Sequence, residues 1–304
     1  MEFQGFRAER DDDGRRLDRV LRRFLPNLPL SAVYRLIRRG LVRVNEKRAL
    51  PEARIKEGDL LSIASGALDG SPLAEIPPKI ASSIPSLIEL ARSDDLLFLS
   101  KPAGVPTHGP GSLADLVLAR EGSGHSLSFA PGPLHRLDRD TTGVIAFSLS
   151  LQGAQWFTQA IRERRLDKRY LAVLGGSLET GAVWRDPCDD GKDMACEARP
   201  LARSRVYGID ATLALVRLIT GRKRQIRLQA ASRGMPLLGD VKHGSRFPGP
   251  YLLHAWRLSL PDDRPAGVPA EVVAPLPDRM REFIRENYGV DTLAHLDRGD
   301  LYWA

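Results

Sequence analysis

The densest polar cluster ahead of a predicted strand in this sequence reads Pro133-Leu-His-Arg-Leu-Asp-Arg-Asp-Thr-Thr-Gly143. Six consecutive positions there hold five ionisable side chains: His135, Arg136, Asp138, Arg139 and Asp140. The glycine that ends the stretch opens an apolar run at 144–148, which is typical of a buried strand. Functional side chains concentrate in loops that a rigid scaffold holds in place, so this loop is the first candidate for a functional site.

Three interpretations of Asp138 are open from the residues alone. His135 and Asp138 would be two ligands of a metal ion, but no nearby residue supplies a convincing third ligand. Asp138 would instead cap a turn or pair with a neighbouring arginine, which is a structural role. In the third interpretation it is a catalytic carboxylate among cations. A free Asp has a pKa of about 3.9 and an adjacent Arg lowers it, which favours an ionised nucleophile or base.

Strands and helices flank this loop without the regular rhythm of a parallel βαβ fold. Apolar runs predict strands at 87–90, 96–100, 144–148, 170–174, 213–219 and 254–260. Helices are predicted at 151–164 and at 224–233, the second of them closed by Gly234. We therefore expect an α+β fold with a mixed, largely antiparallel sheet.

A small α/β module precedes this region. Apolar side chains recur at i, i+3, i+4 and i+7 from Leu17 to Phe24, which predicts a helix that Pro26 ends. Ser31 is expected to cap a second helix that ends before Gly40. Strands are predicted at 41–45 and 60–63. The second helix also carries a basic stripe: Arg35, Arg38 and Arg39.

Positive charge is held in patches. The net charge is +7, and residues 16–48 hold ten Lys or Arg against two acidic residues, a local balance of +8. Residues 222–246 hold seven against one, whereas residues 262–300 have a balance of −4. Basic patches are typical of proteins that bind polyanions. A solvated helix face is the other interpretation.

Composition changes mark the domain boundaries. Residues 66–86 are rich in Pro, Gly, Ser and Ala without a period, which predicts a linker between a module at 1–65 and a larger domain at 87–290, with a C-terminal tail at 291–304. No apolar run approaches the roughly 18 residues of a membrane span, and no secretory signal is evident. We expect a cytoplasmic monomer with no membrane partner. Its two cysteines, Cys188 and Cys196, are expected to be reduced thiols in a surface loop.

Residues 135–143 resemble the signature of the RluA-type pseudouridine synthases, in which the Asp is catalytic. Four further stretches match in order: 100–108, with Ser100 where Asn is more usual, 168–172, 220–227, and 234–240 with Gly244. The N-terminal module is similar to the small RNA-binding domain named after ribosomal protein S-four. The resemblance covers most of 14–260.

This resemblance implies the pseudouridine synthase fold and the conversion of uridine in structured RNA, expected to be 23S-type large-subunit ribosomal RNA, to pseudouridine. It implies that Asp138 attacks or deprotonates at the target nucleotide, that Tyr170 stacks on the flipped uracil, and that Arg227 holds Asp138 ionised. Arg136 would lie near the RNA strand and fill the space left by the flipped base. Further RNA contacts are expected from His135, Arg139, Lys168, Arg222, Arg224, Arg35, Arg38 and Arg39. Neither a cofactor nor a metal is implied.

Several alternatives stay open. Tyr170 would also suit a sheet core, and the run 222–227 a solvated helix face. Lys223 and Arg224 stand where the family commonly has Thr and His, and Gln229 where a His is common, which leaves the hydrogen bonding of the pocket in question. A non-catalytic RNA-binding or ribosome-assembly factor is the alternative function, although such a protein would be expected to have lost residues of the Asp138, Tyr170 and Arg227 set. A metal-dependent phosphoesterase is a third possible function, and chelators would inhibit such an enzyme.

Overall fold

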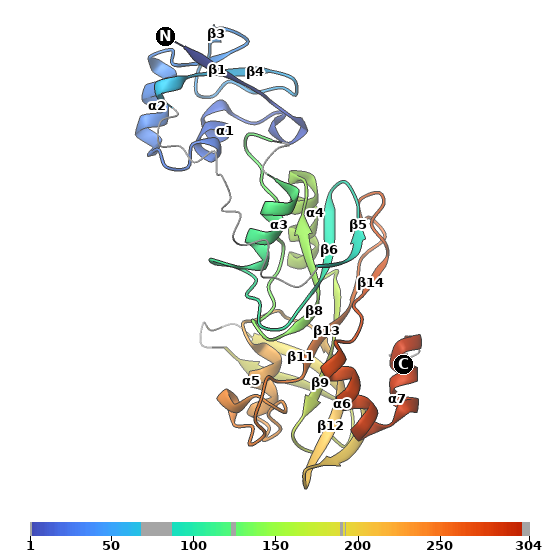
Figure 1. Cartoon of the computed structure of the whole chain (residues 1–304). Helices are drawn as coiled ribbons and strands as arrows, with labels where there is room; N and C mark the ends of the chain where they lie inside the picture. The colour runs from blue at the N-terminus through green and yellow to red at the C-terminus, as the bar shows by residue number, and fades with distance from the viewer. Residues whose placement is uncertain (1, 68–86, 123–125, 189–190, 192, 300–304) are drawn as a thin grey trace.

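The computed structural model describes residues 2–67, 87–122, 126–188, 191 and 193–299. Apart from its first two residues, the predicted linker at 66–86 lies outside the described residues. A small N-terminal unit lies at one end of an elongated chain, and the larger domain forms the rest (Figure 1).

The N-terminal unit is an antiparallel sheet covered by two helices. Its strand order is β1-β4-β2-β3. The strands are β1 (Phe3–Arg7), β2 (Val42–Val44), β3 (Lys47–Arg48) and β4 (Leu60–Ala64). Helices α1 (Leu17–Phe24) and α2 (Leu30–Arg38) bury their apolar faces in a core of their own, which also receives Ile55.

The predicted cap of the second helix is wrong. Pro29 is the N-cap of α2, and Ser31 lies inside the first turn. Proline has no N–H to lose and its fixed φ suits a helix start, so the helix begins before the serine. Two 3₁₀ turns, η1 (Arg10–Asp12) and η2 (Ser65–Ala67), also belong to this unit.

The larger domain is built on a ten-stranded sheet with the main order β10-β11-β12-β9-β13-β8-β6-β5, to which β14 adds beside β13 and β7 beside β8. Among the described strands, only β8 and β13 pair in parallel, which confirms a mixed, largely antiparallel α+β fold. The strands are β5 (Ile88–Arg92), β6 (Leu96–Lys101), β7 (Gly132–Pro133), β8 (Thr142–Ser148), β9 (Asp167–Leu174), β10 (Ala182–Pro187), β11 (Asp193–Val206), β12 (Ile209–Leu218), β13 (Leu253–Ser259) and β14 (Glu271–Val273).

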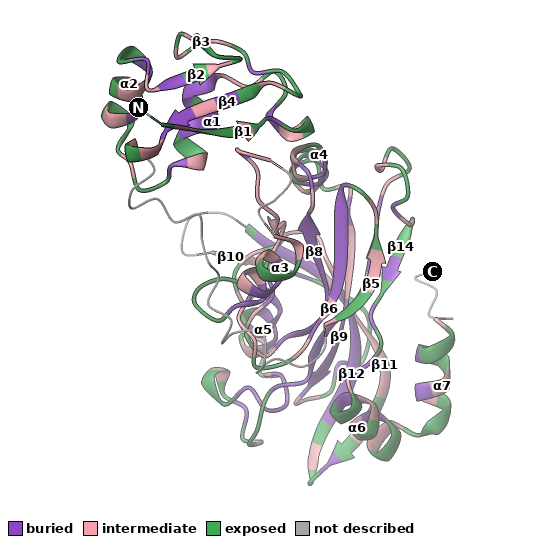
Figure 2. Cartoon of the chain, turned by 45° about the horizontal axis from the view of Figure 1, so that its top comes forward, coloured by how far each residue is buried: buried purple, intermediate pink, exposed green. Residues whose placement is uncertain are grey.

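Helices cover both faces of this sheet, and the central strands are buried (Figure 2). The alternation along β9 shows why: Tyr170, Ala172 and Leu174 face a cluster that includes α3 (Leu113–Glu121) and α5 (Gln225–Ala231). The intervening residues of β9 face a second cluster that includes α6 (Asp278–Tyr288) and α7 (Val290–Arg298), while α4 (Leu151–Arg162) packs in a third cluster with β6 and β8. Within the described residues no helix is long and apolar enough to cross a membrane.

Two expectations need correction. Residues 291–298 of the expected tail at 291–304 belong to α7, because Leu293 and Leu296 pack into the core at helical spacing before Gly299 ends the helix. Residues 300–304 lie outside the described residues. The two cysteines do not share a surface loop, because Cys196 is fully buried in β11, and burial raises the pKa of its thiol to about 12.

Candidate active site

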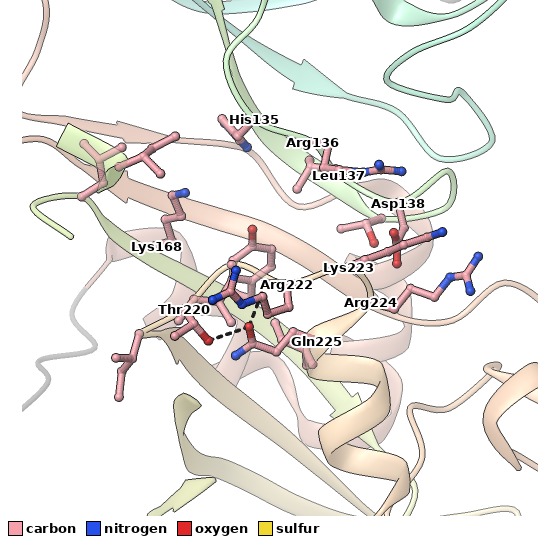
Figure 3. A pocket seen from close by; sticks show the side chains of 18 of the residues that line it. His135, Arg136, Leu137, Asp138, Lys168, Thr220, Arg222, Lys223, Arg224 and Gln225 are labelled. Atoms are coloured by element: carbon pink, nitrogen blue, oxygen red, sulfur yellow. Dashed lines mark hydrogen bonds between the residues drawn. The ribbon is translucent and has the colours of Figure 1, made fainter. Parts of the chain in front are cut away.

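A cavity of about 760 Å³ opens on one side of the sheet. It is lined by the polar loop that precedes β8, the C-terminal end of α4, two residues of β9, and the segment that leads from β12 into α5 (Figure 3). Asp138, Tyr170 and Arg227 all line this cavity, although 89 residues separate the first from the last.

Hydrogen bonds to the backbone on both sides of Asp138 hold this part of the loop in place. The Thr107 hydroxyl donates to the carbonyl of Leu137 at 2.9 Å and accepts from its N–H at 3.2 Å. On the other side, the ammonium of Lys101, 1% exposed, donates to the carbonyl of Arg139 at 2.7 Å. Burial lowers the pKa of Lys101 to about 8, against the opposing effect of Asp138 and of the acidic residue at 140. The side chain of Asp138 is 17% exposed and therefore reaches the cavity from a fixed backbone.

Arg227 contacts Asp138 through one nitrogen, as predicted, but its main partner is another carboxylate. Nη1 of Arg227 donates to Oδ2 of Asp138 at 3.2 Å. Nε and Nη2 donate to the two oxygens of Asp240 at 2.7 and 2.8 Å, and the guanidinium lies 4.2 Å from the ring centroid of Tyr251. Burial alone would lower the pKa of Arg227, but its hydrogen bonds to Asp240 outweigh this and raise that pKa.

Asp240 completes this network and is 2% exposed. It also contacts Nδ1 of His243 at 2.8 Å. Burial would raise the pKa of Asp240, but hydrogen bonds from Arg227 and His243 lower it. Sequence reasoning did not assign Asp240 or Lys101 to the site, although both lie within the stretches that carry the resemblance.

Tyr170 and Lys168 project from the same face of β9 because they are two residues apart. Tyr170 is buried yet lines the cavity, and burial together with nearby Asp138 raises the pKa of its hydroxyl, so the phenol stays protonated. Lys168 points into the cavity (Figure 3). Burial lowers the pKa of its ammonium to about 8, and within the part of the chain that the structure describes the ammonium has no hydrogen-bond or ion-pair partner.

His135 lies at the cavity wall in a structural hydrogen bond. The N–H of Ala146 in β8 donates to its Nε2 at 3.1 Å, which places the ring proton on Nδ1, and the ring stacks on Phe157. Burial, and to a lesser extent the charge of Lys168, lowers the pKa of His135 to about 3, so the ring is neutral. Among the described residues, no group of three or more His, Cys, Asp or Glu is placed to hold a metal ion.

The rim of the cavity is cationic. Arg136 and Lys223 are exposed there, while Arg222 and Arg224 are half-buried. Arg139 is exposed outside the lining and donates to the carbonyl at 104. The stripe predicted on α2 is also exposed: Arg35, Arg38 and Arg39.

The departures from the family pattern fall in two places. Lys223 and Arg224 lie on the rim, and Arg224 adopts φ +56° where it begins α5. Gln229 is fully buried behind the cavity, where it donates to Asp186 at 2.7 Å and to the carbonyl at 184. The amide of Gln229 therefore joins α5 to β10 and does not line the cavity.

A carboxylate beside a buried arginine, in a cavity with a cationic rim, suits an enzyme that acts on a polyanion. The family model described as RNA pseudouridylate synthase matches residues 95–232, and the S4 domain matches residues 15–61. The larger domain thus matches the RNA pseudouridylate synthase family over residues 95–232, and the resemblance seen in the sequence is confirmed.

Curated relatives agree with this assignment, and a solved structure shows a similar fold. Ribosomal large subunit pseudouridine synthase C of Vibrio vulnificus is 27% identical over 308 residues, covering 91% of this chain and 94% of the relative. The protein of the same name from Escherichia coli K12 is 29% identical over 250 residues, 78% of each chain. The structure of human RNA pseudouridylate synthase domain containing 4 covers 65% of this chain and 92% of its own, with a TM-score of 0.54 and 23% identity, and shows the fold.

Proposed function

We propose that this protein converts specific uridines of large-subunit ribosomal RNA to pseudouridine, with Asp138 as the catalytic residue. The observation that carries the proposal is the single contact between Arg227 and Asp138. Nη1 of Arg227 engages Oδ2, whereas no described residue donates a hydrogen bond to Oδ1 in the cavity. One oxygen is thus oriented and the other is available to a substrate.

The reaction suits this set of residues. The N-glycosidic bond from N1 of uracil to the sugar breaks, the base turns, and C5 forms a bond to the same sugar carbon. The proton on C5 is lost and N1 regains one, so nothing is oxidised or hydrolysed. A carboxylate that acts as nucleophile or base, a platform for the base and a proton acceptor meet these needs.

Tyr170 is the proposed platform. Its ring is held by the core cluster and lines the same cavity as Asp138, so a flipped uracil that enters the cavity would stack on a ring that the core fixes in place. A base inside a helix must leave the stack to reach such a site, at a cost of a few kcal/mol that is smallest for an unpaired nucleotide. Unpaired loops of the RNA are therefore the expected targets.

The cationic rim is proposed to hold the RNA strand. Phosphates or the displaced strand around the target would meet Arg136, Arg222 and Arg224 on the rim, Arg139 outside the lining and Lys168 inside the cavity. The exposed stripe on α2 would add contacts farther away. Recognition of structured RNA rests mainly on shape, phosphates and 2′-hydroxyls, which suits a rim rich in Arg and Lys. His135 is neutral, so it would contact the RNA through the edge of its ring and would contribute no charge.

The test is a map of pseudouridine across the ribosomal RNA of a strain that lacks this protein. We expect one or a few large-subunit positions to lose pseudouridine, to regain it with the wild-type gene, and to remain uridine with Asp138→Asn. An unchanged map in the deletion strain would contradict the proposal.

A further inference from the structure

The N-terminal unit contacts the larger domain through a buried carboxylate. Asp12, in turn η1, has 0% of its surface exposed. Its side chain accepts hydrogen bonds from the hydroxyl of Ser126 at 2.8 Å, the N–H of Leu127 at 2.9 Å and the hydroxyl of Ser128. These donors lie more than 110 residues away in the chain, so the carboxylate is satisfied mainly by the other domain.

Two neighbours of Asp12 extend the contact. Nη1 of Arg15 donates to both the carbonyl and the hydroxyl of Ser128, at 3.0 and 2.9 Å. Asp11 accepts the N–H of Leu151 at 2.9 Å, which is one of the unpaired donors at the start of α4. The helix dipole favours a carboxylate at this N-terminus. Burial acts in the opposite direction and raises the pKa of Asp11.

An apolar side chain crosses in the opposite direction. Leu127, which belongs to the larger domain, packs against the core of the N-terminal unit. The larger domain thus supplies both hydrogen-bond donors and one core residue to the RNA-binding unit. Both domains share one chain, which gives such a contact an effective concentration on the order of millimolar, so an interface too weak to join two separate proteins can still form.

We infer that η1 and residues 126–128 form an interdomain joint that fixes the S4 domain relative to the cavity, so that both bind one RNA as a single surface. The functional half of this inference rests on the proposed function. A fixed spacing selects RNAs whose target nucleotide and second contact lie at matching positions, and a freely tethered domain would not impose that selection.

The joint is tested with one variant on each side and a matched control. Asp12→Asn keeps the volume of the side chain, but its amide N–H groups would face the hydrogen-bond donors at 126–128. Ser126→Ala combined with Ser128→Ala weakens the joint without touching the S4 domain, in case Asp12→Asn disturbs η1 itself. Glu57→Gln removes the same charge from an exposed position of the same domain.

Small-angle X-ray scattering of the full chain is expected to show a larger radius of gyration for both joint variants and an unchanged one for Glu57→Gln. For activity, we expect kcat/KM on a large ribosomal RNA fragment to fall about tenfold in the joint variants. On a short stem-loop that carries only the target, kcat/KM should stay within about twofold, because the cavity is untouched.

Scattering that is unchanged in both joint variants would overturn the joint. Expanded scattering with an unchanged ratio between the two RNAs would overturn its role in substrate selection. A wild-type protein inactive on both RNAs would overturn the proposed function, while the scattering would still decide whether the joint exists.

Discussion

Asp138 owes its position to buried residues that do not line the cavity. Thr107 and Lys101 hold the backbone on either side of it, and Asp240 holds the arginine that contacts its side chain. The sequence motifs predicted that Asp138, Tyr170 and Arg227 would share a site. They could not reveal Asp240 as the main partner of Arg227, because that pairing depends on how the 3₁₀ turn after residue 240 packs against α5.

Asp240→Asn tests this supporting role. Removing one partner of a buried ion pair leaves an uncompensated charge, so we expect the free energy of unfolding to fall by about 3 kcal/mol. We also expect kcat to fall, because Arg227 loses its fixed orientation. Denaturant unfolding and single-turnover kinetics measure the two effects.

The control is Asp297→Asn, whose side chain and whose partner Arg281 are both exposed by 40% or more. Its loss should cost about 1 kcal/mol or less because water screens the pair. Equal losses of unfolding free energy in the two variants would contradict the role of Asp240 as the buried partner of Arg227.

Lys168 gives a prediction about pH. Its pKa is lowered to about 8, so its positive charge is present below that pH and is lost as the pH rises toward 9. If Lys168 binds RNA, the affinity of the wild-type protein should fall between pH 7 and 9. Lys168→Met should bind more weakly at pH 7 and show a flatter profile, whereas Lys223→Met, on the exposed rim, should keep the wild-type profile. Identical pH profiles for the wild type and Lys168→Met would exclude this role.

At the scale of elements, apolar runs predicted the strands that form the centre of the sheet, such as β6, β8 and β9. They failed for β11, whose face alternates charged and apolar residues and whose register shifts between Pro200 and Ala202. Helix α3 was missed although Ser112 and Asp115 form a capping box at its start, a signal that is readable from sequence. Residues of α7 were taken for a tail because two leucines alone give a weak pattern.

Gly143 joins the loop that carries Asp138 to the sheet, and its substitution gives a prediction at the scale of elements. It has φ +109°, and a Cβ there would overlap the backbone carbonyl of Ala255 in β13. Gly143→Ala is therefore expected to lower the free energy of unfolding by about 3 kcal/mol or more and to displace Asp138. Gly132→Ala, where a Cβ meets nothing within 4 Å, is the control for denaturant unfolding. A Gly143→Ala protein as stable as this control would contradict the packing described.

At the scale of the whole molecule, the S4 domain and the catalytic domain are both expected to bind the RNA. The basic stripe on α2 should contribute mainly through phosphates, and each phosphate contact changes the slope of log K against log salt by about 0.9 on duplexes and less on single strands. Replacing Arg35, Arg38 and Arg39 together by Ala should weaken binding and reduce that slope by about two. The control replaces the exposed Arg279 and Arg285 of the acidic C-terminal region and should leave the slope unchanged. A slope unaffected by the first replacement would exclude the stripe from the RNA interface.

The most direct measurement is the rate of pseudouridine formation by purified Asp138→Asn, taken together with its thermal midpoint and its RNA affinity. The amide keeps the shape but is neither nucleophile nor base. We therefore predict a rate at least about a thousandfold lower, equivalent to about 4 kcal/mol of barrier, with RNA affinity unchanged or slightly higher and with the protein folded. A variant that melts early yet converts uridine at close to the wild-type rate while folded would contradict the catalytic role of Asp138.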